Sequence, residues 1–157
     1  MRAADVAEAL PTARMDDGVL PAVRMVARHR VPGLAVADEH GHVVTCVSSV
    51  DLLRLVLPRH LWDEPCLARV FDEAHADRVA GRLVGVRIRD VVAEVAGRVP
   101  VVRPEATVVE LVELMTRSGC PLALVGEAGG RPTGIVTANR LLDLMAAEVE
   151  NAGEEGP

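Results

Sequence analysis

The feature that most constrains this chain is an internal repeat. Pro121 lies 89 positions after Pro32, and the same offset relates residues 12–56 to residues 101–145 without a gap. In a repeat protein each copy is one supersecondary unit, and it buries its apolar face against the neighbouring copy. We therefore predict a duplicated domain with two similar halves.

Each copy shows the same alternation of apolar runs and helical spacing. In the second copy, Thr107 and Glu110 have the spacing of a capping box, and Leu111, Leu114 and Met115 follow at helical spacing. The order of elements is β-α-β-β-α, twice, which predicts an α/β (α+β) fold. The expected strands cover residues 11–13 and 99–102, 33–37 and 122–125, and 43–47 and 133–136.

Residues 58–85, between the copies, have no counterpart elsewhere in the chain. Leu67, Val70, Phe71 and Ala74 form an apolar stripe there, which predicts a helical insert. The expected organisation is a first repeat over 1–57, the insert over 58–85, a second repeat over 86–148, and a disordered acidic tail over 149–157.

Composition and charge limit the classes of function. All 17 residues in the Lys and Arg count are arginines, which excludes a Walker A lysine, a Schiff-base lysine and a lysine general base. The net charge of -6 argues against a general nucleic-acid or anionic-membrane binder. No apolar run approaches the roughly 20 residues of a membrane span, and no signal-peptide pattern begins the chain. We expect a cytoplasmic protein that binds neither nucleic acid nor membrane.

The clearest candidate site combines Ser48 and Asp51, where a strand ends and a helix begins. A serine with a carboxylate three residues later makes a capping box, which is a purely structural role. The same groups suit a ligand, because a helix start with a hydroxyl favours phosphate and a carboxylate accepts hydrogen bonds from a ribose diol. Both interpretations stay open at this point.

Two stretches resemble the hydrophobic-Ser/Thr-x-x-Asp-Leu-Leu signature of the CBS-domain family: CVSSVDLL at residues 46–53 and GIVTANRLL at 134–142. The resemblance covers nearly all of residues 1–148 outside the insert. It implies a Bateman module, in which two CBS repeats pack with pseudo-twofold symmetry around two clefts. It further implies a regulatory sensor of AMP, ADP, ATP or S-adenosylmethionine, a homodimer, and a regulated partner that the sequence does not name. No cofactor or metal is required.

The resemblance also assigns residues in the first cleft. Ser48 and Asp51 correspond to the positions that hold phosphate and ribose. Arg30 precedes the second strand, where it serves either as a phosphate ligand or as a solvated helix end. The expected wall of this cleft consists of Thr12, Ala13, Val31 and Pro32.

The second copy departs from the pattern. Thr137 and Pro121 are retained, but Arg140 stands where the ribose-binding aspartate belongs. A guanidinium only donates hydrogen bonds, so it cannot replace an acceptor for a diol. The second cleft is therefore expected to be either unused or suited to an anion.

Catalysis is not expected, because no nucleophile–base pair, metal cluster or cofactor loop stands out in the sequence. The alternative to ligand sensing is a purely structural dimerisation or interaction module. In that case the insert, with Trp62 and Phe71, would form the surface for a partner.

Overall fold

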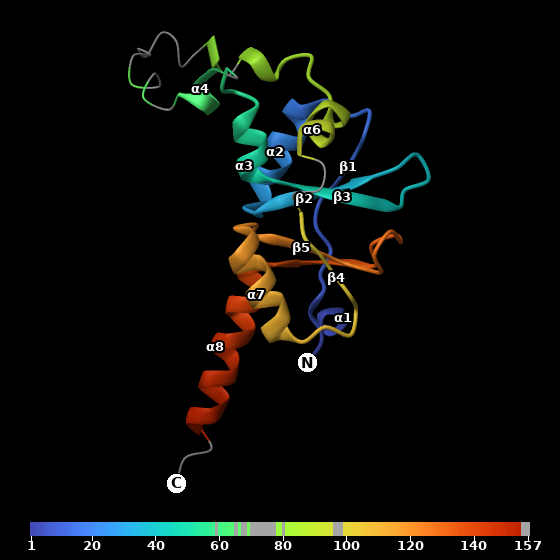
Figure 1. The fold of residues 1–157 in the computed structure, drawn as a ribbon, viewed down its shortest axis with the longest axis vertical. Helices are drawn as coiled ribbons and strands as arrows, with labels where there is room; N and C mark the ends of the chain where they lie inside the picture. Colours follow the sequence, from blue (N-terminus) through green and yellow to red (C-terminus); the bar gives the residue numbers. More distant parts are fainter. Residues whose placement is uncertain are drawn as a thin grey trace.

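The strands form two three-stranded sheets, ordered β1-β2-β3 and β4-β5-β6. The computed structural model describes residues 1–58, 60–64, 66, 69, 78–79, 81–95 and 99–154. The sheets lie one above the other (Figure 1). Their strands are β1 (Thr12–Arg14), β2 (Gly33–Ala37), β3 (Val43–Ser48), β4 (Val101–Val102), β5 (Leu122–Val125) and β6 (Gly134–Thr137). The predicted α/β architecture, with one sheet for each repeat, is confirmed.

The register of the strands shows that the two sheets are copies of one another. The first strand of each sheet runs parallel to the second, and the second runs antiparallel to the third. Gly33 pairs with Ser48 in one sheet, and the equivalent residues Leu122 and Thr137 pair in the other. The sequence repeat is therefore a repeat of topology as well.

The helix that follows the first strand has 11 residues in both copies, but only the second copy has a side-chain cap at its start. It is α2 (Val19–His29) in the first and α7 (Val108–Ser118) in the second. At the start of α7 the Glu110 amide donates to Thr107 Oγ1 at 3.2 Å, and the Thr107 amide donates to the Glu110 carboxylate at 2.7 Å. The predicted capping box is thus present, and it satisfies amides that have no partner within the helix.

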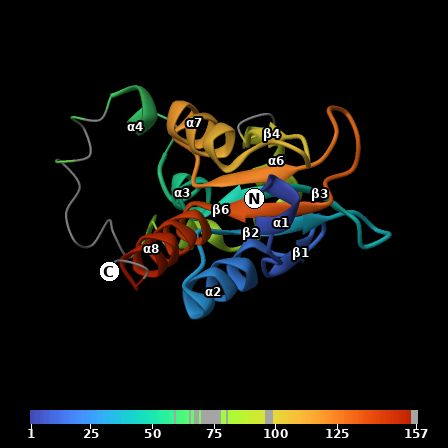
Figure 2. The same ribbon diagram turned by 90° about the horizontal axis from the view of Figure 1, so that it is seen from below.

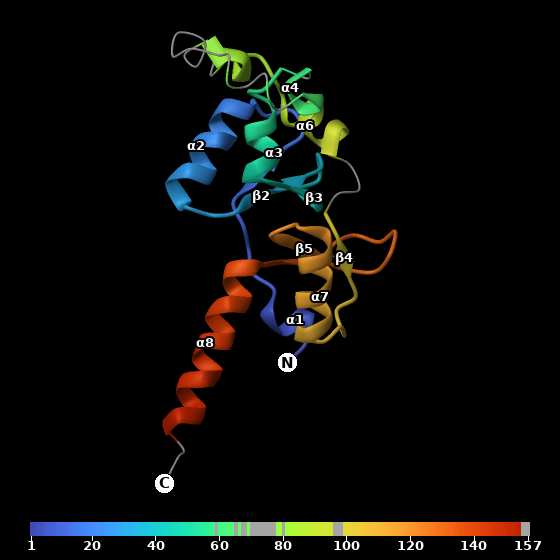
Figure 3. The ribbon, with the colours of Figure 1, turned by 60° about the vertical axis from the view of Figure 1, so that its left-hand side comes forward.

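The closing helices differ in length. They are α3 (Ser49–Arg54) and α8 (Ala138–Glu154). Leu141 is buried near the start of α8, whereas the rest of the helix extends away from the body (Figures 1 and 3). The helix therefore continues into the segment expected to be disordered, because its Ala, Leu, Met and Glu residues are strong helix formers. No helix in the described part of the chain is long and apolar enough to cross a membrane.

The first helix of each copy packs on the sheet of the other copy, an exchange that the sequence did not predict. Ala3 belongs to the core of the second sheet, and Ile88 belongs to the core of the first. The Ala3 amide donates to the Ala106 carbonyl at 2.8 Å, and the Ile88 amide donates to the Asp17 carbonyl at 2.9 Å. These two bonds are equivalent under the repeat. The exchanged helices are α1 (Ala3–Val6) and α6 (Ile88–Val95).

The insert is described only in part. It contains a short helix, α4 (His60–Asp63), and a 3-10 turn, η2 (Gly81–Leu83). Leu61 and Leu83 are buried. The predicted apolar stripe lies outside the described residues, since it consists of Leu67, Val70, Phe71 and Ala74.

The two sheets face each other across a small apolar core. Viewed along the long axis, helix α8 lies to one side of the strands, and the β2–β3 and β5–β6 turns lie toward the opposite side (Figure 2). A Cβ atom on Gly33 would lie 2.6 Å from Leu122 Cδ1. The Leu122 side chain therefore fills the space that a side chain at the equivalent position 33 would need. The core residues between the sheets are Ala35, Cys46, Val99, Leu122, Leu124 and Ile135.

Candidate ligand-binding clefts

Ser48 and Asp51 form a closed hydrogen-bonding unit at the start of α3. The Asp51 amide donates to Ser48 Oγ at 3.1 Å. The Ser48 amide and hydroxyl both donate to Asp51 Oδ2, at 3.1 Å and 2.7 Å. The two residues are 4% and 7% exposed. The capping box is therefore present, and it holds the carboxylate in a defined orientation.

A cavity of about 350 Å³ adjoins this unit. Its size falls within the usual range for small-molecule pockets. The first repeat contributes residues from α3 and its cap, and the second contributes the connection between α7 and β5. The lining residues are Ser48, Val50, Asp51, Arg54, Ser118, Gly119, Cys120 and Pro121. The cleft is thus built jointly by both repeats.

Arg54 also lines this cavity, and the sequence analysis did not identify it. It lies three residues after Asp51 on the same helix, and residues at this spacing share a helix face. That spacing is the signal that could have identified it. A fixed carboxylate and a nearby guanidinium can accept hydrogen bonds from hydroxyls and donate them to an anion.

Two cysteine thiols lie near the cleft. Burial, with smaller contributions from the nearby Cys120 and Asp51, raises the pKa of Cys46 to about 12. Burial also raises the pKa of Cys120, opposed by a backbone hydrogen bond at Leu122 and supported by the charge of Asp51. Both thiols are therefore neutral at physiological pH, unlike the low-pKa cysteines that act as nucleophiles. No group of three or more His, Cys, Asp or Glu residues within the described ranges could hold a metal.

The residues expected to form the wall of the first cleft do not lie together in the structure. Ala13 is buried in the core of the first sheet, and Val31 packs against that core. The Pro32 carbonyl accepts a hydrogen bond from the Ser49 amide at 2.8 Å. Pro121, the equivalent of Pro32, borders the Ser48 cavity. In the Ser48 cavity, the second repeat therefore supplies the wall that was expected from the first.

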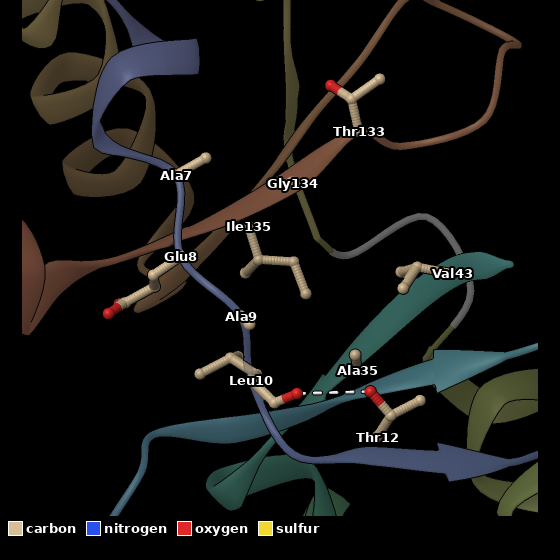
Figure 4. Close-up of a pocket in the computed structure, with 10 residues that line it drawn as sticks. All are labelled: Ala7, Glu8, Ala9, Leu10, Thr12, Ala35, Val43, Thr133, Gly134 and Ile135. Atoms are coloured by element: carbon tan, nitrogen blue, oxygen red, sulfur yellow. Dashed lines mark hydrogen bonds between the residues drawn. The ribbon is translucent and has the colours of Figure 1, made fainter. Parts of the chain in front are cut away.

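Thr12 lines a separate cavity of about 320 Å³ beside the segment that precedes β1. Its hydroxyl donates to the Leu10 carbonyl at 3.3 Å. Ile135 and Val43 lie across this space from different sheets, whereas the Glu8 side chain points away from them (Figure 4). This cavity is thus mainly apolar.

Thr137 is the equivalent of Ser48 in the second copy, and it is 3% exposed. The Arg140 amide donates to Thr137 Oγ1 at 3.1 Å, as the Asp51 amide does to Ser48. The Thr137 hydroxyl donates to the carboxylate of Glu8, a residue that the sequence analysis did not single out. Arg140 is half-buried.

Arg30 does not border the Ser48 cavity. It is exposed and ends α2 in the left-handed conformation, with φ 51°, and its amide donates to the Val26 carbonyl. Gly119, at the equivalent position after α7, has φ 63°. The arrangement is that of a helix C-cap, a position that usually favours glycine.

Two β-α-β-β-α units, each preceded by a helix that packs on the other unit, and a jointly built cleft define a tandem CBS pair. The family model of the CBS domain matches residues 88–147. A CBS domain-containing protein of unknown function from Kribbella flavida is 36% identical, with a TM-score of 0.64, over 93% of this chain and 99% of that chain. The chain belongs to the CBS-domain family.

More distant solved structures show the same fold. CBSX2 from Arabidopsis thaliana is 18% identical over 96% of each chain, with a TM-score of 0.67. A putative acetoin utilization protein from Vibrio cholerae is 15% identical over 100% of this chain and 98% of that chain, also with a TM-score of 0.67. None of the curated proteins compared with the chain matches it.

Proposed function

We propose that this protein is a regulatory module that binds an adenosine-type ligand in the Ser48–Asp51 cleft and thereby changes its association with another protein. The observation that carries this proposal is the cavity of about 350 Å³ whose lining includes a hydroxyl, a carboxylate and a guanidinium. The fold supports it by analogy, since CBSX2, 19% identical and with a TM-score of 0.64, has been solved in complex with AMP. The proposal includes no catalytic step and requires no cofactor.

The polar groups divide the recognition of such a ligand between them. Asp51 is held by two donors from Ser48, and its carboxylate has further acceptor capacity for ribose hydroxyls. Arg54 supplies the cation for a phosphate, with a charge-assisted hydrogen bond that is stronger than a neutral one. Val50 and Pro121 give the cavity apolar surface for a base.

The joint construction of the cleft provides a route to regulation. A ligand that touches α3 and the α7–β5 connection together makes contacts that depend on how the two repeats are placed. It shifts the module between two arrangements only by the difference in its affinity for them. The regulated partner would recognise one arrangement more strongly than the other.

Isothermal titration calorimetry with AMP, ADP, ATP and S-adenosylmethionine tests the ligand and the site. Asp51→Asn keeps the size of the side chain and removes the charged acceptor. A hydrogen bond to a charged group contributes about 1.5–3 kcal/mol, so we expect roughly a 10- to 100-fold weaker affinity. Glu127→Gln, an exposed change in the β5–β6 turn away from α3 and α8, is the control.

Arg54→Ala should reduce the affinity for the nucleotides, which carry phosphate, more than it reduces the affinity for S-adenosylmethionine. Equal affinity of wild type and Asp51→Asn would remove the site assignment. If none of the four compounds binds, the ligand is not of the adenosine type.

We also propose that the module forms a homodimer through α3 and α8. The equivalent residues Leu53 and Leu142 are 64% and 63% exposed, and Val50, Met145 and Val149 on the same two helices are also exposed. Clustered exposed apolar side chains mark contact surfaces. The occupant we propose is a second copy, because Leu53 and Leu142 are equivalent under the repeat, so that two copies can present matching apolar helices to each other.

Light scattering after size exclusion distinguishes monomer from dimer. Leu53→Glu and Leu142→Glu should each give a monomer, because a charge would be buried in the contact. Val109→Glu, an exposed apolar position on α7, is the control. A wild-type monomer would rule out the dimer. A dimer that binds none of the adenosine compounds would favour the purely structural role.

A further inference from the structure

The equivalent hydroxyls of the two repeats donate their hydrogen bonds to carboxylates in different parts of the chain. In the first half, the Ser48 hydroxyl donates to Asp51, three residues away on the adjoining helix. In the second half, the Thr137 hydroxyl donates to Glu8, which is 129 residues away in the chain. The position equivalent to Asp51 is occupied by Arg140, whose amide still donates to Thr137 Oγ1. The carboxylate missing from the helix is therefore replaced by one from the segment before β1.

Glu8 is held in this place by its backbone as well as by its side chain. Its amide donates to the Ile135 carbonyl at 2.8 Å, and the two residues form an isolated antiparallel bridge. The Glu8 side chain leaves the chain on the side away from Val43 and Ile135 (Figure 4). From this position it reaches Thr137, two residues further along β6, and the side chain of Glu8 is half-buried.

We propose that Glu8 is an internal occupant of the second cleft, so that each chain binds a single ligand, in the Ser48–Asp51 cleft. This inference rests on the proposed function. The Ser48 and Thr137 hydroxyls each donate their one hydrogen to a carboxylate, but the two carboxylates enter from different places. Asp51 belongs to the helix that lines the Ser48 cavity, whereas Glu8 comes from the segment before β1, which is bonded to β6 at Ile135. A ligand that approached Thr137 would have to displace the Glu8 side chain, and any phosphate it carried would meet a carboxylate of the same sign.

The same geometry predicts what the second cleft would bind once Glu8 is removed. Thr137 and Arg140 would then offer a hydroxyl and a guanidinium without a carboxylate between them. Those groups suit an anion and lack a charged acceptor for a ribose diol. The opened cleft should therefore bind ATP in preference to adenosine, whereas the Ser48–Asp51 cleft accepts both parts of a nucleotide.

Calorimetric titration with ATP tests the proposal in four proteins: wild type, Glu8→Ala, Asp51→Asn, and the double variant. We expect one site per chain in wild type and two in Glu8→Ala. In Asp51→Asn the single site should remain with roughly 10- to 100-fold weaker affinity. The double variant should show this weakened site and one further site of the affinity seen for the gained site in Glu8→Ala, because each change acts on one cleft. Glu127→Ala makes the same change of charge in the exposed β5–β6 turn and should leave one site.

Glu8→Gln distinguishes the effect of the side chain's volume and hydrogen bond on the second cleft from the effect of its negative charge. Glutamine keeps the length of the side chain and an oxygen that accepts from Thr137, so this variant should stay at one site. Circular dichroism melts of all variants verify that they are folded. The half-buried Glu8 side chain can be truncated without opening a sealed core cavity.

The outcomes are distinguishable from a failure of the proposed function. One site in both wild type and Glu8→Ala overturns the proposal, and so do two sites in wild type that fall to one in Glu8→Ala. Two sites in Glu8→Gln would also overturn it, since the hydrogen-bonded side chain would then not be what closes the cleft. If wild type binds nothing, the Ser48 cleft assignment fails, yet a single site gained in Glu8→Ala would still support internal occupancy. No site in either protein overturns both.

Discussion

Replacing Gly33 with alanine should destabilise the whole module, although it adds only one methyl group. A Cβ atom at this position would lie 2.3 Å from the Val47 carbonyl oxygen and 2.6 Å from Leu122 Cδ1. Ordinary van der Waals contacts of such an atom are 3.4–4 Å long. One neighbour is backbone of the adjoining strand β3, and the other is a fully buried side chain of the opposing sheet. Relief therefore requires movement of a strand or a sheet.

The size of the effect follows from this geometry. Overpacking a close-packed core costs about 1–3 kcal/mol, and the short distance to a backbone oxygen places Gly33→Ala near the upper end. For a chain of this length, each kcal/mol lowers Tm by about 2–4 °C. We therefore expect Tm to fall by roughly 6–12 °C.

Urea and thermal unfolding followed by circular dichroism measure this change. Gly81→Ala is the matched control, because a Cβ there meets nothing within 4 Å and should alter stability by less than about 0.5 kcal/mol. Leu122→Ala by itself should cost about 3 kcal/mol. Combined with Gly33→Ala it should cost less than the sum, by about 1 kcal/mol, because one of the two clashes disappears. A Tm for Gly33→Ala within 2 °C of Gly81→Ala would refute the reasoning.

Three further predictions follow from local geometry. Arg30→Gly should raise the free energy of unfolding by about 0.5–1 kcal/mol, measured by urea unfolding, because only glycine adopts a positive φ without steric cost; a loss of stability would contradict this. Hydrogen bonds from the amide and hydroxyl of Thr107 lower the pKa of Glu110 from 4.5, so its contribution to stability is present above that pH and is lost as the pH falls below it. The Tm difference between wild type and Glu110→Gln should therefore narrow between pH 7 and pH 3, and a constant difference would count against it. An aromatic disulfide reagent at pH 8 should modify the exposed Cys66 in the folded protein but Cys46 only after unfolding, because burial raises the pKa of Cys46 to about 12; rapid modification of both would show that the core between the sheets opens.

Local structure could be predicted from the sequence because its causes are local. The spacing of Thr107 and Glu110 places a helix start where the structure has one. The alternation of apolar runs predicts the strands, and the constant offset of the repeat predicts that Gly33–Ser48 and Leu122–Thr137 are equivalent pairs. The resemblance of the two Ser/Thr-bearing motifs to the CBS signature led to the family. A capping hydrogen bond between residues three positions apart and the periodic burial of a strand or helix depend only on residues that are close in the sequence.

Only the tertiary structure decided which parts of the two copies meet. The first helices are exchanged between the sheets, and Pro121 rather than Pro32 borders the Ser48 cavity. The bond from Thr137 to Glu8 joins two residues 129 positions apart. Such contacts depend on how two similar units pack face to face. The sequence pattern is the same whether a motif contacts residues of its own repeat or residues of the other repeat. The sequence by itself therefore determined two similar halves and, through Arg140, one difference between the two clefts. The packing of the two units decided the other difference, which is the contact between Thr137 and Glu8.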